Sequence, residues 1–307
     1  MEREAREAPV AIVPEPHEVA LRAAANAGTV AGISSLATIS LAEAGALTSG
    51  PKLFQLYVHH DEGLNQAMLD AARDAKFDAV ALTVDTIVGG NRERCLRSGF
   101  TSPPRFTAGN MLSYAAKPGW GLNYLLREKF SLPNLATHVS EGSSVPKSVA
   151  EYFTSMLDQS LDWKRAEAIR KAWDGPFCLK GIMAVEDARL AVDIGATAIM
   201  VSNHGGRQLD GSRAPFNALA EIVDAVGDRI EVICDGGITR GSHVLKALSV
   251  GAKACSGGRL YLYALAAAGE DGVARVLALL RAEIERGMKL MGAKSLADLS
   301  RDNLRWR

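Results

Sequence analysis

The sequence predicts an α/β fold, namely a TIM (β/α)8 barrel with a long insertion after its fourth strand. Short apolar runs alternate with amphipathic stretches along the chain, which is the pattern of a parallel sheet with right-handed crossovers. Eight such runs in 307 residues fit a barrel better than an open doubly wound sheet. A Rossmann-type sheet is the alternative, but no GxGxxG motif follows any early run. We therefore expect one domain over 1–307.

The expected strands are short runs of apolar and β-branched residues flanked by glycine, proline or polar residues. In chain order they are Val10–Val13, Val30–Ser34, Leu53–Tyr57, Ala79–Val84, Phe177–Lys180, Ala198–Val201, Glu231–Cys234 and Ala254–Ser256. Between them, apolar residues at spacings of three and four predict helices over Glu62–Lys76, Val185–Ile194, Pro215–Val226 and Ser242–Val250.

One segment interrupts this alternation. No strand is predicted between Asp85 and Phe177, Ser98–Ser148 is rich in glycine, proline, serine and aromatic residues, and Ser148–Trp173 has a helical pattern. An insertion of this length in a compact barrel usually has a function, so we interpret about 89–160 as a lid or interaction surface. A disordered linker is the alternative, although the aromatic residues and leucines favour packing.

Composition excludes several classes of protein. Lys plus Arg number 35 and equal Asp plus Glu, so the chain lacks the basic excess typical of nucleic-acid binding. The four cysteines form no CxxC pair, which argues against a metal site or a disulfide framework and favours a reducing, cytoplasmic setting. No apolar run reaches the length of a membrane span, and the charged start Met1–Ala8 does not resemble a secretory signal.

The most informative motif is VSNHGGRQLD, which directly follows an expected strand. In a barrel the carboxyl ends of the strands meet at one mouth, where His204 suits general-base work and Arg207 suits a substrate carboxylate. Asp85 ends a buried strand, where an unpaired carboxylate is costly, so we expect it to pair with His204 and hold the imidazole tautomer. Arg92 is a second guanidinium for the same substrate, with a surface ion pair to Glu93 as the alternative.

Three further stretches point to a phosphate-bearing heterocycle. The glycine-rich turns CDGGITR and SGGR follow the last two expected strands, where this barrel usually binds phosphate, and Arg259 adds a charge there. Lys180 ends strand five and needs a negative partner, such as the anion that develops on a flavin. Gln55 and Thr83 supply the neutral hydrogen bonds that a heterocycle requires. A Schiff-base lysine in an aldolase is the alternative for Lys180.

Taken in order, FQLY, LTVDTxxxGxRE, LKGI, SNHGGRQLD, DGGI and GGR resemble the FMN-dependent α-hydroxy acid dehydrogenase/oxidase family. That family includes L-lactate dehydrogenases and oxidases, glycolate oxidase and mandelate dehydrogenase. The resemblance runs from about Pro9 to Arg307, and after Leu53 it is greatest to bacterial L-lactate dehydrogenases. It implies FMN as cofactor and oxidation of a small L-2-hydroxy acid, L-lactate first, to the 2-oxo acid, with the α-hydrogen passing to flavin N5.

The resemblance also implies a role for each candidate residue. His204 takes the substrate hydroxyl proton, Asp85 supports it, Tyr57 contacts the substrate oxygens, and Arg92 and Arg207 hold the carboxylate. FMN is contacted at its ring system and at its ribityl phosphate by Ser34, Gln55, Thr83, Lys180, Asp235, Gly237, Arg240, Gly258 and Arg259.

The same resemblance implies partners and a location. The electron acceptor is oxygen, a quinone or a cytochrome, and the chain forms a homotetramer. The aromatic and basic residues of the insertion permit peripheral binding to the inner face of a membrane.

Three features depart from the family pattern. Only Met1–Ala8 precede Pro9, so an N-terminal substrate tyrosine of the family has no counterpart. The loop after the first expected strand is short, and Thr239 stands where many members have a phosphate-binding arginine, with Arg240 next to it. A flavin-binding or catalytically weakened barrel, or another FMN barrel chemistry, is therefore the alternative function.

Overall fold

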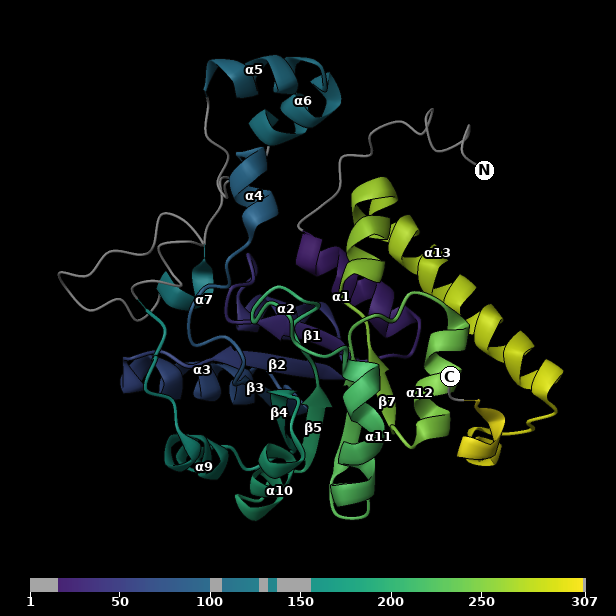
Figure 1. Cartoon of the computed structure of the whole chain (residues 1–307). Helices are drawn as coiled ribbons and strands as arrows, with labels where there is room; N and C mark the ends of the chain where they lie inside the picture. Colours follow the sequence, from purple (N-terminus) through teal and green to yellow (C-terminus); the bar gives the residue numbers. More distant parts are fainter. Residues whose placement is uncertain (1–15, 100–106, 127–131, 137–155, 306–307) are drawn as a thin grey trace.

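The computed structural model describes residues 16–99, 107–126, 132–136 and 156–305. Within them, seven parallel strands form one curved sheet whose spatial order follows the sequence (Figure 1). The strands are β1 (Ala31–Ser34), β2 (Lys52–Tyr57), β3 (Ala79–Thr83), β4 (Phe177–Ile182), β5 (Ala198–Val201), β6 (Glu231–Asp235) and β7 (Ala254–Ser256). The predicted α/β barrel class is confirmed, and the expected strand Val10–Val13 lies outside the described residues.

Helices connect successive strands, as right-handed crossovers require. They are α2 (Leu41–Leu47), α3 (Glu62–Asp74), α9 (Trp163–Ala172), α10 (Val185–Asp193), α11 (Pro215–Val226) and α12 (Gly241–Val250). Helix α1 (Pro16–Asn26) precedes β1, and α13 (Arg259–Met291) follows β7 and leads to two 3-10 turns, η2 (Leu296–Asp298) and η3 (Arg301–Asn303). Each of the four helices predicted between strands is present, with ends that differ from the prediction by at most two residues. In the described part of the chain, no helix has the length and apolar character needed to cross a membrane.

Side chains alternate along each strand between the helices and the inside of the curved sheet. Phe54 and Leu82 belong to the large core that packs against the helices. Ala81, Cys178 and Met200, each one residue out of phase with that core, form a separate cluster inside the sheet. The next inward positions toward the carboxyl ends are polar, so the sheet itself directs a ring of polar side chains to its mouth.

The insertion between β3 and β4 contains four short helices in its described part. They are α4 (Glu93–Ser98), α5 (Ala108–Ala115), α6 (Pro118–Leu126) and α7 (Pro133–Ala136). The first three project away from the sheet, whereas α7 lies against the body of the protein (Figure 1). Asn134 of α7 is buried, donates to the Ile39 carbonyl at 3.0 Å and accepts from the Leu41 amide at 2.9 Å. This part of the insertion therefore anchors the loop that follows β1.

The helix predicted over Ser148–Trp173 is wrong in part. Residues 148–155 lie outside the described residues, and helix α9 begins only at Trp163. The Asp162 side chain accepts the amide hydrogen of Arg165 and so caps the helix at this point. Before it, Leu157 forms an antiparallel bridge with His59, and this pairing satisfies the backbone in an extended conformation.

Candidate active site

The inner face of the sheet carries polar side chains at the carboxyl ends of neighbouring strands. Ser34 pairs with Gln55 in the strand register, and Thr83 pairs with Lys180. Gln55 Nε2 donates to Thr83 Oγ1 at 3.0 Å and to the hydroxyl oxygen of Tyr57 at 3.3 Å. The structure thus brings these five sequence-predicted residues to one mouth, where an amide and two hydroxyls face the same space.

Lys180 has its negative partner within the protein. Its Nζ lies 2.6 Å from Asp235 Oδ2 and 3.1 Å from Ser202 Oγ, and Ser202 Oγ also donates to Asp235 Oδ2 at 2.7 Å. Burial alone would raise the pKa of Asp235, but the Lys180 charge and these hydrogen bonds outweigh it and hold the pKa below its ordinary value. An ammonium fixed in this ion pair does not suit a Schiff-base lysine, which must lose its proton to act as a nucleophile.

Asp85 and His204 pair, as the sequence predicts. Asp85 Oδ1 lies 3.1 Å from His204 Nδ1, and Thr86 Oγ1 donates to the same carboxylate oxygen at 2.9 Å. The other oxygen, Oδ2, is buried and has no hydrogen-bond partner among the described residues. Gly181 of β4 lies so close that a Cβ there would stand 2.6 Å from the Asp85 Cβ. The carboxylate is therefore confined between β4 and the histidine.

The turn that carries His204 is unusually tight. His204, Gly205 and Gly206 have φ angles of 56°, 68° and 71°, a left-handed region that side chains with a Cβ rarely adopt. The His204 amide donates to Ser202 Oγ at 3.1 Å, and Arg259 Nη2 donates to the Gly205 carbonyl at 2.7 Å. The glycines of the motif thus let the chain reverse directly after β5, so that the imidazole faces Asp85.

The positive charges of Arg92 and Arg207 interact at the mouth, beside the buried Tyr57. Burial and the charge of Arg207 both lower the pKa of Arg92. The Tyr57 ring lies 6.5 Å from the His204 ring, and burial and the Asp85 charge raise the pKa of its hydroxyl. The carboxylate of Glu93, which was the alternative partner for Arg92, accepts from Arg97 at 2.7 Å. Two guanidinium groups that repel each other are an arrangement that a bound carboxylate would stabilise.

The glycine-rich turns after β6 and β7 lie side by side and are sterically open. The Gly236 amide donates to the Ser256 carbonyl, which joins the two turns. A Cβ at Gly237 or at Gly258 would have nothing within 4 Å, so their backbone is accessible to a large ligand. Together with the Lys180–Asp235 pair and the polar rim, these turns fit the FMN that the motifs imply.

Arg240 forms an ion pair with a glutamate of α13. Its Nε donates to both carboxylate oxygens of Glu283 in α13, at 2.9 and 3.0 Å, and its side chain is 66% exposed. The Gly241 amide donates to the same carboxylate at 2.7 Å. The structure therefore places this arginine in an ion pair that joins α12 to α13, and its contact with a phosphate stays a prediction.

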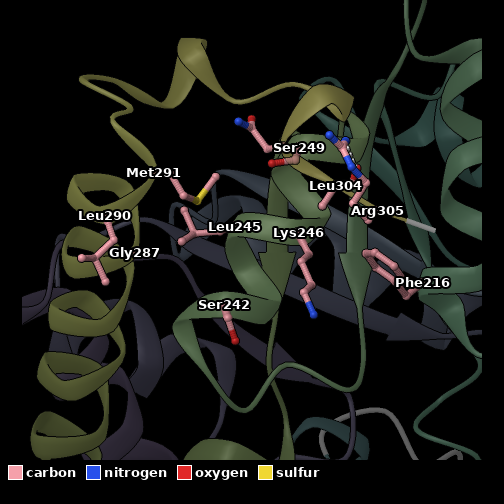
Figure 2. A pocket seen from close by; sticks show the side chains of 11 residues that line it. Phe216, Ser242, Leu245, Lys246, Ser249, Gly287, Leu290, Met291, Leu304 and Arg305 are labelled. Carbon is pink, nitrogen blue, oxygen red and sulfur yellow. Dashed lines mark hydrogen bonds between the residues drawn. The ribbon is translucent and has the colours of Figure 1, made fainter. Parts of the chain in front are cut away.

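A separate hollow of about 390 Å³ lies between α12, α13 and the residues after η3 (Figure 2). Leu245 and Met291 make up part of its apolar lining, and Lys246 and Arg305 line it as well. Ser249 also lines it, although its buried hydroxyl has no hydrogen-bond partner in the described part of the chain. No sequence-predicted site residue lines this hollow, so it is not the candidate active site.

Sequence reasoning missed two residues at the mouth. Thr86 donates a hydrogen bond to the carboxylate of the adjacent Asp85, and Gln208 donates to the loop after β3. Ser202 belongs to the VSNHGGRQLD motif that the sequence places at the mouth, and it bonds to the Lys180–Asp235 pair. Thr86 and Gln208 both lie within recognised motifs, but Gln208 is 123 residues from Asp85 in sequence, so no local pattern shows its contact.

Comparisons with known proteins agree with this geometry. The sequence profile described as FMN-dependent dehydrogenase matches residues 8–306. The L-lactate dehydrogenase of Caulobacter sp. (strain K31) is 39% identical over 93% of this chain and 75% of its own length. Glycolate oxidase 1 of Oryza sativa subsp. indica is 39% identical over 95% of this chain and 73% of its own.

A solved structure, described as the monotopic membrane protein (S)-mandelate dehydrogenase, superimposes with a TM-score of 0.87. It is 34% identical, and the match covers 95% of this chain and 77% of the solved one. The resemblance drawn from the motifs is confirmed, and with it the FMN dependence that defines the family. The chain therefore belongs to the FMN-dependent dehydrogenase family.

Proposed function

We propose that this protein oxidises a small L-2-hydroxy acid, L-lactate first, to the 2-oxo acid. The observation that carries the proposal is the Asp85–His204 pair, 3.1 Å between Oδ1 and Nδ1, beside a tyrosine and two arginines. Relatives named for lactate, glycolate and mandelate all match the chain, which supports a 2-hydroxy acid as the substrate class. When bound, FMN supplies the acceptor for the two electrons that leave the substrate.

His204 acts as the base in this proposal. Asp85 occupies Nδ1, which leaves Nε2 to take the proton of the substrate hydroxyl. The imidazolium that forms lies next to the carboxylate, and this charge stabilises it. Gly181 limits the space around Asp85, so the Asp85 carboxylate stays in place while the proton moves to His204.

Arg92 and Arg207 bind the substrate carboxylate. Each lowers the free energy of the bound anion, and the anion in turn relieves the repulsion between them. Tyr57 keeps its proton at neutral pH, because burial and Asp85 raise its pKa, and donates a hydrogen bond to a substrate oxygen. When the arginines hold the substrate carboxylate, the hydroxyl on the adjacent carbon points toward His204.

The residues that would hold FMN divide into two groups. Ser34, Gln55, Thr83 and Lys180 provide hydrogen bonds and charge at the ring system. The turns after β6 and β7 provide backbone N–H groups and Arg259 at the phosphate.

The test is an absorption spectrum of the purified holoprotein under anaerobic conditions. L-Lactate, glycolate and (S)-mandelate are added separately, with D-lactate as the control for handedness. Loss of the oxidised flavin bands, fastest with L-lactate, supports the proposal, whereas a yellow protein that no 2-hydroxy acid reduces contradicts it. His204→Ala should retain FMN and lose most of its turnover, and normal turnover in this variant would exclude the base assignment.

We also propose that the insertion brings the protein to the inner face of a membrane, where a quinone or a cytochrome accepts the electrons. Helices α5 and α6 expose Met111, Leu112, Leu122 and Leu126, which are 50–77% exposed. Sedimentation with anionic phospholipid vesicles should carry the protein down, and Leu112→Glu should weaken this. This proposal fails if the wild-type protein stays in the supernatant and transfers electrons to oxygen as fast as it does to a soluble quinone.

The same proposal includes a homotetramer. Sedimentation equilibrium of the holoprotein measures the assembly directly, and a monomer at micromolar concentration would contradict it.

A further inference from the structure

We propose that Gln208 is a positioning residue that holds the segment carrying Asp85 and Arg92 against the turn carrying His204 and Arg207. The inference rests on the proposed function, because it concerns how those four residues are held. Gln208 touches none of the reacting groups in this proposal. It acts through the main chain of the loop after β3.

The Gln208 amide joins two loops that are distant in sequence. Its Nε2 donates to the carbonyl oxygen of Asp85 at 3.3 Å and to that of Val88 at 3.0 Å. A primary amide has two hydrogens, so one side chain satisfies both carbonyls. These carbonyls bracket the turn directly after β3, whereas Gln208 itself follows the turn after β5. The side chain therefore fixes the distance between the two catalytic loops.

Close backbone packing fixes the same two loops at a second point. A Cβ at Gly90 would lie 2.1 Å from the Arg207 carbonyl oxygen and 2.8 Å from the Gln208 Cα. Only glycine permits this approach, because any side chain would force the segments apart. The segment 85–90 is thus held near its start by hydrogen bonds and at its end by packing. Arg92, two residues beyond, is placed relative to Arg207 by this contact.

The chemistry of the amide explains why a glutamine stands here. Gln208 Oε1 is buried and has no hydrogen-bond partner among the residues that the structure describes. Burying such an acceptor without a partner costs about 1–3 kcal/mol of stability, so some other interaction of the same side chain must offset this cost. The two donated bonds provide that interaction. A glutamate would lose both donors and direct a carboxylate at two carbonyl oxygens, and methionine would fill the space without any bond.

Loss of the Gln208 hydrogen bonds should therefore weaken substrate binding and slow the chemical step at the same time. A loosened loop displaces Asp85 from His204 and Arg92 from Arg207 together. A displacement of about 1 Å in a reacting geometry costs on the order of 100-fold in rate. We therefore expect Gln208→Met to lower kcat by about 10- to 100-fold and to raise the KM for L-lactate.

The experiment uses the FMN-loaded protein and the variants Gln208→Met and Gln66→Met. Gln66 is the matched control, since it is an exposed glutamine on α3 whose Nε2 bonds only to Asp70 at 3.0 Å among the described contacts. Binding of pyruvate, followed by its perturbation of the flavin spectrum, reports the arginine pair without turnover. We expect its Kd to rise about tenfold in Gln208→Met and to stay unchanged in Gln66→Met.

A double-mutant cycle tests whether Gln208 acts through Asp85. If it does, adding Gln208→Met to Asp85→Asn lowers kcat much less than it does in the wild type, because the pair is already lost. Independent, additive losses would overturn the inference, as would a Gln208→Met variant within twofold of wild type in kcat and in pyruvate affinity. If Gln208→Met does not fold, Gly90→Ala probes the second contact between the same two loops and should show the same joint defect.

The outcome for Gln208 is separable from the outcome for the proposed function. If Asp85→Asn and His204→Ala turn over normally, the proposed base is wrong whatever Gln208 does. If both lose activity while Gln208→Met does not, only the positioning role fails.

Discussion

Replacement of Asp85 by asparagine removes the negative charge beside the proposed base, His204, and preserves the shape of the side chain. Two unit charges separated by the observed 3.1 Å attract by about 5 kcal/mol at an effective dielectric constant of about 20. The two side chains are 13% and 19% exposed, so solvent screens this attraction only in part. Asparagine retains a neutral hydrogen bond worth about 1 kcal/mol. The imidazolium therefore loses about 4 kcal/mol, which corresponds to about a 1000-fold slower proton transfer.

The assay is anaerobic stopped-flow reduction of the bound flavin by L-lactate. FMN occupancy is first checked by absorbance, so that a slow rate is not mistaken for loss of cofactor. Asp70→Asn is the matched control, because Asp70 pairs with Arg73 on the outer surface of α3 and is 52% exposed. We expect the control to reduce at the wild-type rate. An Asp85→Asn rate within threefold of wild type would show that the carboxylate does not stabilise the protonated base.

Three further changes test the structure itself. Ser249→Ala should raise the free energy of unfolding by about 1–2 kcal/mol, because the buried Ser249 hydroxyl has no partner among the described residues. The control Ser242→Ala, at an exposed position, should change it by less than about 0.5 kcal/mol, and both free energies are measured by urea denaturation. Gly181→Ala should destabilise the protein by more than about 2 kcal/mol and slow turnover, because φ is 117° and the new Cβ would meet Asp85 at 2.6 Å; wild-type melting and rate would contradict the confinement of the carboxylate. Because the pKa of Asp235 is lower in the folded protein than in the unfolded chain, its ionised carboxylate stabilises the fold at a pH above the ordinary pKa. This stabilisation is lost as the pH falls through the pKa of the folded protein, so Asp235→Asn should make the free energy of unfolding depend less on pH in the acid range. An unchanged pH dependence would show that the pair with lysine does not couple to folding.

The sequence predicts the barrel because its signals are local. Strands such as Ala198–Val201 and helices such as Pro215–Val226 are bounded by their own glycines, prolines and polar residues, so their limits agree with the structure. The Asp85–His204 pair is also predictable, because the two residues follow strands β3 and β5 of a parallel sheet, on either side of β4, where carboxyl ends converge.

The differences from the sequence prediction arise where distant contacts decide the outcome. Arg240 is paired by Glu283, which lies 43 residues along the chain, so no local pattern shows that its charge is already balanced. The segment before Trp163 has a helical pattern but pairs with the strand end at His59 instead. Propensity sets a small preference of a few tenths of a kcal/mol per residue, and such tertiary pairing overrides it.

The neutral net charge of the chain conceals an uneven distribution at the mouth. Lys180 is balanced by Asp235 and Arg240 by Glu283, so neither adds a net positive charge there. The positive charge of Arg92 acts on that of Arg207, and both positions belong to loops that meet at Gly90. In the proposed mechanism, a bound carboxylate relieves that repulsion only while the two loops keep their spacing, and the same spacing holds His204 in line with Asp85. Under this proposal, affinity for the acid and placement of the base both depend on the contacts between these two loops, so a substitution there should alter KM and kcat together rather than either one alone.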